Sequence, residues 1–243
     1  MTMCSRGIYL LSLRQLQNYL NREPSLQGGL SLWDRIGDER RKKAGQMRPE
    51  HAKLAQLGAG LLLQLSFLPR EELYGEVRFL SPEELLERIP GNVQAQGAGA
   101  ADVPYGPCRI GEHGKPYFTD PALPFFNLSH SGDLVGIVFA DVECGLDLQE
   151  YRTLDMEALA RRFFSEGDAE ALREMAEEQR REAFFRFWTR REAYGKALGC
   201  GLLPVIGLDF RKIGLYGHLP EDVCWEEPEV PGGYAMSVCY RRS

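Results

Sequence analysis

The sequence lacks the features that mark several large classes of protein. No apolar run approaches the roughly 20 residues of a membrane-spanning helix. The N-terminal segment has too short an apolar run, and no recognisable cleavage site, for a signal peptide. Six scattered cysteines without a CxxC pair argue against a zinc site and a disulfide framework. The formal net charge of −6 gives no support to nonspecific nucleic-acid binding. We therefore expect a soluble protein of the reducing cytoplasm that binds neither membranes nor nucleic acid.

Two common nucleotide-binding fingerprints are also missing. The sequence contains neither a P-loop nor the glycine pattern of a Rossmann fold. This argues against a nucleotide-binding protein of those two kinds. With 243 residues, 44% of them hydrophobic, the chain can form one large domain or two small ones.

Helical and extended patterns occur along the whole chain. The patterns predict a strand running into a short helix or loop over 8–20, and a flexible loop over 91–102. Other helices are expected at 51–67, 83–88, 154–164, from an N-cap at Ser165 through 178, and 184–198. Other strands are expected at 134–140, 142–148, 205–211, 223–227 and 234–240.

The helix expected at 184–198 carries charged residues in an unusual setting. Its aromatic residues recur at three- and four-residue intervals, and Arg191 falls inside that apolar stripe. Glu192 and Lys196 lie one turn apart along the edge of the stripe. The pair is interpreted either as a surface ion pair of small energetic value or as part of a site completed by distant residues. Gly199 and Gly201 are expected to end the helix.

Two segments could contact phosphate groups. The segment 34–53 is rich in Lys and Arg, which indicates either a solvated helix face or a cationic rim for a phosphate-bearing ligand. Ser129, His130 and Ser131 are expected in a turn. Their adjacency does not predict a nucleophilic triad, but hydroxyls, an imidazole and the glycine that follows could cradle a phosphate.

Asp147 is the candidate metal ligand on a strand. It lies between Leu146 and Leu148, and therefore projects to the opposite face of the sheet from them. Gln149 is expected to point away from Asp147. If Glu192 approaches Asp147, the two carboxylates form a hard, oxygen-rich site that suits Mg²⁺ better than zinc.

Four motifs, taken together, resemble the Sfp-type 4′-phosphopantetheinyl transferases. Gly114, Lys115 and Pro116 are similar to the GKP element of that family, and FNLSHSG at 126–132 to its (F/W)N(I/L)SHSG element. GLDLQ at 145–149 resembles G(I/V)D(I/L)E. RRFFSEGD at 161–168, followed by FWTRREAYGKALGCGL, resembles the RFF…W(T/S)xKE(A/S)(Y/F)xKxxGxGL signature. The order and spacing of the four make the resemblance specific.

The resemblance implies an α+β fold of two similar subdomains. The family has two halves related by a pseudo-twofold axis, with the active site in the cleft between them. We expect an N-terminal subdomain at 1–143 and a C-terminal one at 144–243, joined near 141–144. The family also implies a monomer.

The resemblance further implies a reaction and a set of site residues. The 4′-phosphopantetheine group of coenzyme A would pass to a serine of an acyl or peptidyl carrier protein, releasing adenosine 3′,5′-bisphosphate, with Mg²⁺ as cofactor. Asp147, Gln149 and Glu192 would bind the metal, Glu192 would be the base, and Lys196 would hold the pyrophosphate. The remaining coenzyme A contacts would be Arg40, Lys43, Gly114, Lys115, Pro116, Ser129 and His130, of which Arg40, Lys43 and His130 would lie near the 3′-phosphate.

Two residues depart from the family pattern. Gln149 stands where a glutamate is frequent, and Arg191 replaces a usual lysine. An amide oxygen can still bind Mg²⁺, and a water can fill the position, so we expect activity to survive. The alternative is a catalytically weak paralogue that binds coenzyme A or a carrier protein without transfer.

Overall fold

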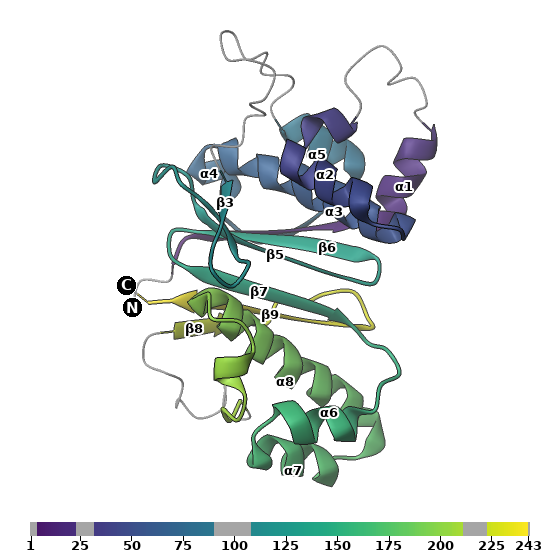
Figure 1. Cartoon of the computed structure of the whole chain (residues 1–243), viewed down its shortest axis with the longest axis vertical. Helices are drawn as coiled ribbons and strands as arrows, with labels where there is room; N and C mark the ends of the chain where they lie inside the picture. The colour runs from purple at the N-terminus through teal and green to yellow at the C-terminus, as the bar shows by residue number, and fades with distance from the viewer. Residues whose placement is uncertain (1–3, 23–31, 90–107, 211–222, 243) are drawn as a thin grey trace.

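The structure is a computed structural model that describes residues 4–22, 32–89, 108–210 and 223–242 (Figure 1). It is a mixed α+β fold, which confirms the predicted class at that level. The loop expected at 91–102 lies outside the described residues. No helix in the described part of the chain has both the length and the apolar character that a membrane span requires.

The strands form two main sheets and a small hairpin. The first sheet has the order β2-β1-β6-β5, in which β1 and β2 are parallel and the other pairs are antiparallel. The second is antiparallel, with the order β7-β9-β8. The strands of the two sheets are β1 (Arg6–Ser12), β2 (Val77–Leu80), β5 (Phe125–Ser131), β6 (Leu134–Ala140), β7 (Cys144–Glu150), β8 (Val223–Glu226) and β9 (Tyr234–Arg241). The hairpin consists of β3 (Cys108–Ile110) and β4 (Pro116–Phe118).

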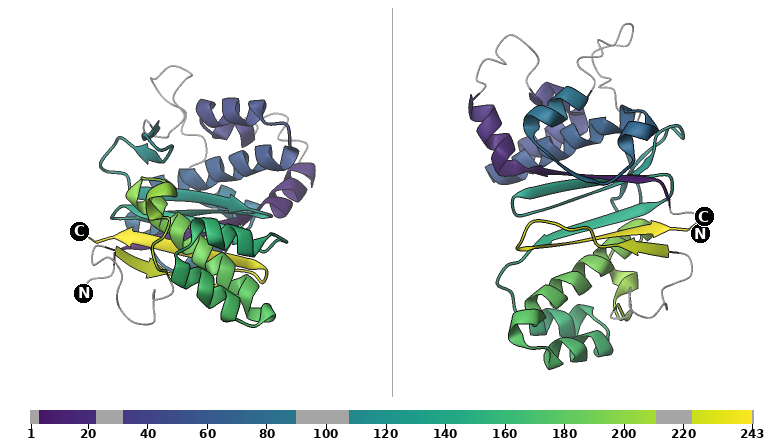
Figure 2. Two further views of the ribbon diagram at one scale, coloured as in Figure 1. Left: turned by 60° about the horizontal axis from the view of Figure 1, so that its bottom comes forward. Right: turned by 180° about the vertical axis from the view of Figure 1, so that it is seen from behind.

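The two sheets lie face to face, with helices on both outer sides (Figures 1 and 2). The helices outside the first sheet are α1 (Leu13–Arg22), α2 (Asp38–Gln46), α3 (Glu50–Leu63), α4 (Arg70–Leu73) and α5 (Pro82–Arg88). Those outside the second are α6 (Met156–Phe163), α7 (Glu166–Glu174) and α8 (Glu177–Leu198). Short 3-10 turns cover Leu32–Arg35, Gln64–Phe67 and Leu203–Val205.

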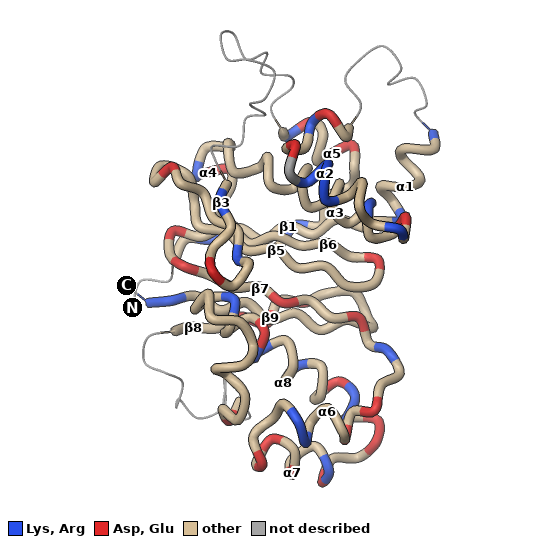
Figure 3. Tube along the Cα trace, in the orientation of Figure 1, with Lys and Arg blue, Asp and Glu red and all other residues tan. Residues whose placement is uncertain are grey.

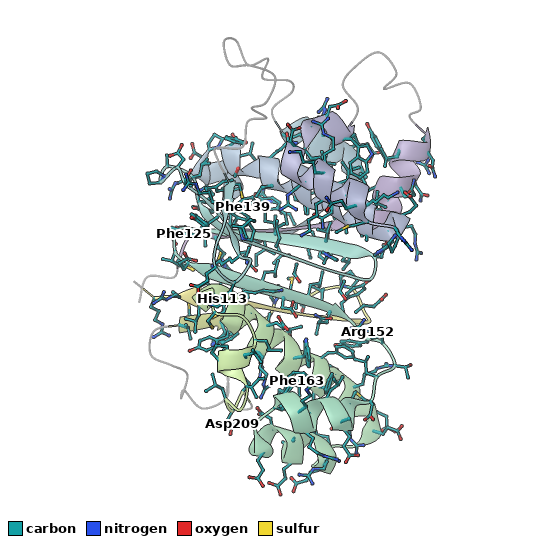
Figure 4. The ribbon with its side chains drawn as sticks, in the orientation of Figure 1. His113, Phe125, Phe139, Arg152, Phe163 and Asp209 are labelled. Atoms are coloured by element: carbon teal, nitrogen blue, oxygen red, sulfur yellow. The ribbon has the colours of Figure 1, made fainter. Side chains whose placement is uncertain are left out.

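Strand β1 contributes side chains to two cores, because successive residues of a strand point to opposite faces of the sheet. Tyr9 and Leu11 point into the core beneath α3, whereas Ile8 and Leu10 point into the core between the sheets. The inter-sheet core also contains Leu146 of β7. Side chains fill the space between the sheets in Figure 4, so the two halves share one continuous apolar layer.

Local signals set the ends of the helices around the site. Ser165 Oγ accepts a hydrogen bond from the amide of Asp168 and caps α7, as predicted. Gly199 has a left-handed conformation, with φ of 66°, and ends α8, also as predicted. Both ends come from residues within one turn of the helix, which is why the sequence revealed them.

Two local predictions are wrong, and the helix expected from Ser165 through 178 ends at Glu174, because residues 177 and 178 already belong to α8. Ser129, His130 and Ser131 belong to β5 and not to a turn, because they pair with β6 through positions such as Ser129 with Gly136. The strand expected at 205–211 is absent over its described residues, which follow a 3-10 turn and then irregular backbone. There the carbonyl groups of Leu208 and Phe210 accept hydrogen bonds from arginine side chains of α8.

Candidate active site

Helix α8 packs directly on strand β7, and a glycine permits this. A Cβ at position 145 would overlap Ala193 O and Ala197 N, so only glycine fits between the two backbones. The facing helix positions Ala193 and Ala197 are also small and buried. This close approach brings α8 side chains that flank Ala193 and Ala197 over Asp147 of β7.

Asp147 is the centre of the resulting cluster, with only 2% of its surface exposed. Lys196 Nζ donates a hydrogen bond to Asp147 Oδ1 over 2.7 Å and forms an ion pair with it. Ser129 Oγ donates to the same oxygen over 3.1 Å. Gln149 Nε2 donates to Asp147 Oδ2 over 3.1 Å. A buried carboxylate is thus held by one cation and two neutral donors.

The position of Gln149 corrects the sequence interpretation. We expected it to point away from Asp147, but residues two apart on a strand share a face of the sheet. Its side chain therefore lies beside Asp147. Gln149 belongs to the same cluster of polar groups as Asp147 and Lys196.

Glu192 lies one turn before Lys196 on the half-buried edge of α8. Loss of solvent raises the pKa of Glu192, the negative charge of Asp147 raises it further, and the positive charge of Lys196 opposes both. The two carboxylates are therefore close enough to repel each other. Within the described residues no group of three or more His, Cys, Asp or Glu side chains is arranged to hold a metal ion. Three groups in this cluster could bind a metal ion through oxygen. They are the carboxylates of Asp147 and Glu192 and the amide carbonyl of Gln149.

Side chains from β5, the β3–β4 hairpin and α8 satisfy the backbone groups of β7 at its unpaired edge, which is largely buried. Alternate residues of β5 accept hydrogen bonds from alternate backbone amides of β7, and two lysines donate to its carbonyl groups. The amide contacts are Leu146 to Asn127 Oδ1 (2.9 Å), Leu148 to Ser129 Oγ (3.2 Å) and Glu150 to Ser131 Oγ (3.0 Å). The carbonyl contacts are Lys115 Nζ to Cys144 (3.0 Å) and Lys196 Nζ to Leu146 (3.0 Å). We call this set of contacts the β5–β7 seam.

The sequence motifs did not lead us to predict the β5–β7 seam. Asn127 and Ser131 were part of a recognised motif, but Asn127 was given no role and Ser131 was considered only as part of a phosphate cradle. Their spacing of two residues around Ser129 is the signal that could have revealed a row of acceptors on one face of a strand. The same row positions β7, and so Asp147, against the first sheet.

The Gly-Lys-Pro element lies in the turn of the β3–β4 hairpin, whose tip carries His113 in Figure 4. Gly114 has a φ of 82°, which favours glycine, and Pro116 begins β4. Lys115 forms an ion pair with Glu143 in addition to its seam contact with Cys144 O. The turn therefore reaches the start of β7.

Basic residues gather on the first half beside this cluster. Loss of solvent lowers the pKa of His130, and the positive charges of Lys196, His51, Lys43 and Arg40 lower it further. Figure 3 shows that Lys and Arg are concentrated on α2, which carries Arg40 and Lys43. His51 on α3 is an additional member that the sequence interpretation did not include. An anion bound among these groups would be stabilised by their combined charge.

Arg191 lies on a different face of α8 and has no exposed surface. It forms an ion pair with Asp168, donates to Phe187 O (2.9 Å) and Leu208 O (2.9 Å), and lies over the ring of Phe164 at 4.1 Å. These contacts attach α8 to α7 and to the segment before residue 210. They explain why a cation can occupy the apolar stripe.

Comparisons with known proteins identify the family of this chain. The model of a family described as the 4′-phosphopantetheinyl transferase superfamily matches residues 143–239. The 4′-phosphopantetheinyl transferase AcpT of Salmonella typhimurium is 34% identical over 148 residues, which cover 56% of this chain and 77% of the relative. The chain belongs to the 4′-phosphopantetheinyl transferase superfamily. The family and the enzyme class predicted from the motifs are thereby confirmed.

Other superfamily members align over shorter shares of their length. The 4′-phosphopantetheinyl transferase HetI of Nostoc sp. is 37% identical over 131 residues, which cover 51% of this chain and 53% of the relative. The 4′-phosphopantetheinyl transferase Sfp of Bacillus subtilis is 31% identical over 140 residues, which cover 53% of this chain and 60% of the relative. The superfamily match includes β7 and α8, the elements that carry Asp147, Glu192 and Lys196.

Proposed function

We propose that this protein transfers the 4′-phosphopantetheine group of coenzyme A to a serine of an acyl or peptidyl carrier protein and releases adenosine 3′,5′-bisphosphate. The observation that carries the proposal is the buried Asp147 held by Lys196, with the Glu192 carboxylate close enough to be destabilised by it. Superfamily membership supplies the class of reaction. The cluster supplies groups that can perform it.

The donor set fits Mg²⁺. Asp147 and Glu192 offer hard carboxylate oxygens, and their mutual repulsion is the charge imbalance that a divalent cation relieves. The carbonyl oxygen of Gln149 is a third donor on the same face of the sheet. We therefore assign Asp147, Glu192 and Gln149 as the residues that would hold the ion. When bound, the ion supplies charge neutralisation for the pyrophosphate.

Glu192 is the proposed general base for the carrier serine. Its carboxylate lies on the half-buried edge of α8 one turn before Lys196, where it would accept the serine proton directly or through a water. Lys196 is proposed to stabilise the negative charge that develops on the pyrophosphate as its bond breaks. Its ammonium group lies between Asp147 Oδ1 and Leu146 O, which fixes its position before the substrate binds.

The basic group on the first half is the proposed site for the 3′-phosphate of coenzyme A. Arg40, Lys43 and His130 contribute positive charge or a hydrogen-bond donor there, and the lowered pKa of His130 reflects in part the nearby cations. Lys115 and Ser129 remain proposed contacts of coenzyme A. Both are already engaged in the β5–β7 seam, so binding would have to share or replace some of those contacts.

The proposed active site lies in a cleft between the subdomains 1–143 and 144–243. The order of the strands supports this division, because every strand of the first sheet precedes Asp141 and every strand of the second follows Val142. The pseudo-twofold relation of the halves, a monomeric state and a cytoplasmic location belong to the same proposal. The proposed site residues come from both halves, so neither half would act alone.

The test is incubation of the full chain with an apo carrier protein, coenzyme A and Mg²⁺. We expect the intact mass of the carrier to increase by one phosphopantetheine group. Glu192→Ala should abolish the increase, whereas Glu182→Ala, an exposed position on the same helix, should not. Tight binding of coenzyme A without transfer to several different carriers would instead support the catalytically weak paralogue.

A further inference from the structure

Two half-buried cysteines that are far apart in the sequence lie beside the core between the sheets. Cys4 lies two residues before β1, and Cys224 lies in β8 at the edge of the second sheet. Both side chains pack against the core between the sheets. The side chain of Cys224 is also close enough to Cys4 to contribute to its raised pKa. Figure 1 shows β8 and the beginning of β1 at the same end of the two sheets.

A neighbouring ion pair joins the two segments that carry these cysteines. Two residues after each cysteine in the sequence, Arg6 binds Glu226 through Nε (2.7 Å) and Nη2 (2.8 Å). Cys224 and Glu226 lie two apart on β8 and share a face of the sheet. Cys4 precedes Arg6 by the same two residues, so the ion pair lies next to both cysteines in the sequence. The backbone amide of Ser5 donates to Asp141 Oδ2 over 3.2 Å and holds the start of the chain in place.

We propose that Cys4 and Cys224 form a reversible disulfide that joins the two sheets. The oxidant is a low-molecular-weight disulfide. The Cys224 thiolate attacks one of its sulfurs and releases one small thiolate, which leaves a mixed disulfide on Cys224. Cys4 then loses its proton to solvent and attacks the Cys224 sulfur, releasing the second small thiolate. Two protein thiols are oxidised and one small disulfide is reduced to two thiols.

The surroundings of the thiols set the rate of this exchange. Burial raises the pKa of Cys4 to about 11, with further contributions from Cys224 and Asp141. Little Cys4 thiolate is therefore present at neutral pH, and the second step should become faster as the pH rises. Under reducing conditions, Cys4 and Cys224 would remain free thiols.

The remaining cysteines allow the pairing to be identified. Cys144 interacts electrostatically with Cys4, but it is fully buried and its pKa is raised to about 12. Cys108 is exposed and would take up the small thiol by itself. Cys200 is half-buried like Cys4 and Cys224, and lies just after α8. It is the matched control.

The experiment uses the full chain carrying Cys108→Ser, treated with oxidised glutathione at pH 8 to 9. We expect an intact-mass loss of about 2 Da, a Cys4–Cys224 cross-linked peptide, faster migration on a non-reducing gel, and reversal by a thiol reductant. Closing so long a loop should raise the Tm by roughly 5–10 °C. Adding Cys4→Ser or Cys224→Ser should abolish the cross-link, whereas adding Cys200→Ser should not.

Two results would overturn the proposal. One is oxidation that yields only mixed disulfides with glutathione on Cys4 and Cys224. The other is a cross-linked peptide that joins Cys4 to Cys144. Both readouts are covalent and do not require transferase activity, so they are independent of the proposed function.

Discussion

The ammonium group of Lys196 lies 2.7 Å from Oδ1 of Asp147, although the two residues are 49 positions apart in the sequence. One comes from helix α8 and the other from strand β7, and Gly145 allows the two elements to touch. The exposed fraction of the Asp147 side chain is 3% and that of Lys196 is 28%. Asp147 is therefore the buried member of the pair. The ammonium group of Lys196 is accessible to solvent and to an anionic substrate.

Removal of the Lys196 cation should impair transfer severely. We expect Lys196→Ala to reduce kcat by roughly 10²- to 10³-fold. Without this ammonium group, the negative charge that develops on the pyrophosphate is no longer neutralised. Lys196→Arg retains the charge with a different geometry and should lose less activity. The initial rate of carrier modification, followed by intact mass, measures both. A rate for Lys196→Ala close to that of Lys196→Arg would argue against a role for this charge.

Glu192→Gln should stabilise the ligand-free protein at neutral pH. The pKa of Glu192 in the folded state is raised above its ordinary value of 4.5, so the ionised carboxylate destabilises the fold. This cost is absent below the ordinary pKa and develops as the pH rises through the folded pKa. The Tm of Glu192→Gln should therefore exceed that of the natural protein at pH 8, and the difference should disappear near pH 4.

Mg²⁺ provides the control for that measurement. Millimolar Mg²⁺ should raise the Tm of the natural protein, because the ion neutralises the two repelling carboxylates. It should have little effect on Glu192→Gln, which retains only one of them. Equal responses of the two proteins to Mg²⁺ would show that Glu192 does not bind the ion.

Local patterns made part of this structure predictable. The aromatic spacing on α8, the Ser165 cap and the stop at Gly199 all depend on residues within a turn or two of one another. The placement of Glu192 and Lys196 one turn apart followed from helix geometry alone. The partnership of that pair with Asp147 was available only through the family resemblance, because no local rule relates α8 to β7.

The errors arose where long-range contacts decide the conformation. Ser129 and its neighbours look like a turn by composition, but pairing with β6 makes them a strand. The residues around Leu208 have a strand-like composition, but Arg191 binds the Leu208 carbonyl, so that group does not take part in a sheet. The β5–β7 seam was missed for the same reason: in each of its contacts a side chain binds a backbone amide or carbonyl group of β7, and the sequence does not distinguish those backbone groups.

Arg191 should contribute to stability. Arg191→Met leaves the fully buried Asp168 without this cation, and we expect the free energy of unfolding to fall by about 3–5 kcal/mol. The double variant Arg191→Met/Asp168→Leu removes both charges and should recover part of the loss. Urea denaturation measures the free energy of unfolding of the natural protein, the single variant and the double variant. A loss below about 1 kcal/mol for the single variant would contradict a buried ion pair.

Asn127 provides the sharpest test of the β5–β7 seam. Its side chain, 3% exposed, accepts a hydrogen bond from the buried amide of Leu146. Asn127→Ala should lower the free energy of unfolding by about 1–3 kcal/mol, because it leaves that amide without an acceptor. Asn127→Asp retains an acceptor oxygen and is the matched control.

Hydrogen exchange at Leu146 separates this mechanism from simple loss of packing. If the side-chain acceptor protects the amide, exchange should become faster in Asn127→Ala and remain slow in Asn127→Asp. Ser131→Ala, at the less buried end of the seam, should affect only the amide of Glu150. Unchanged protection of Leu146 in Asn127→Ala would mean that the Asn127 side chain does not protect this amide. The apolar layer around Leu10 and Val238 would then account for its slow exchange.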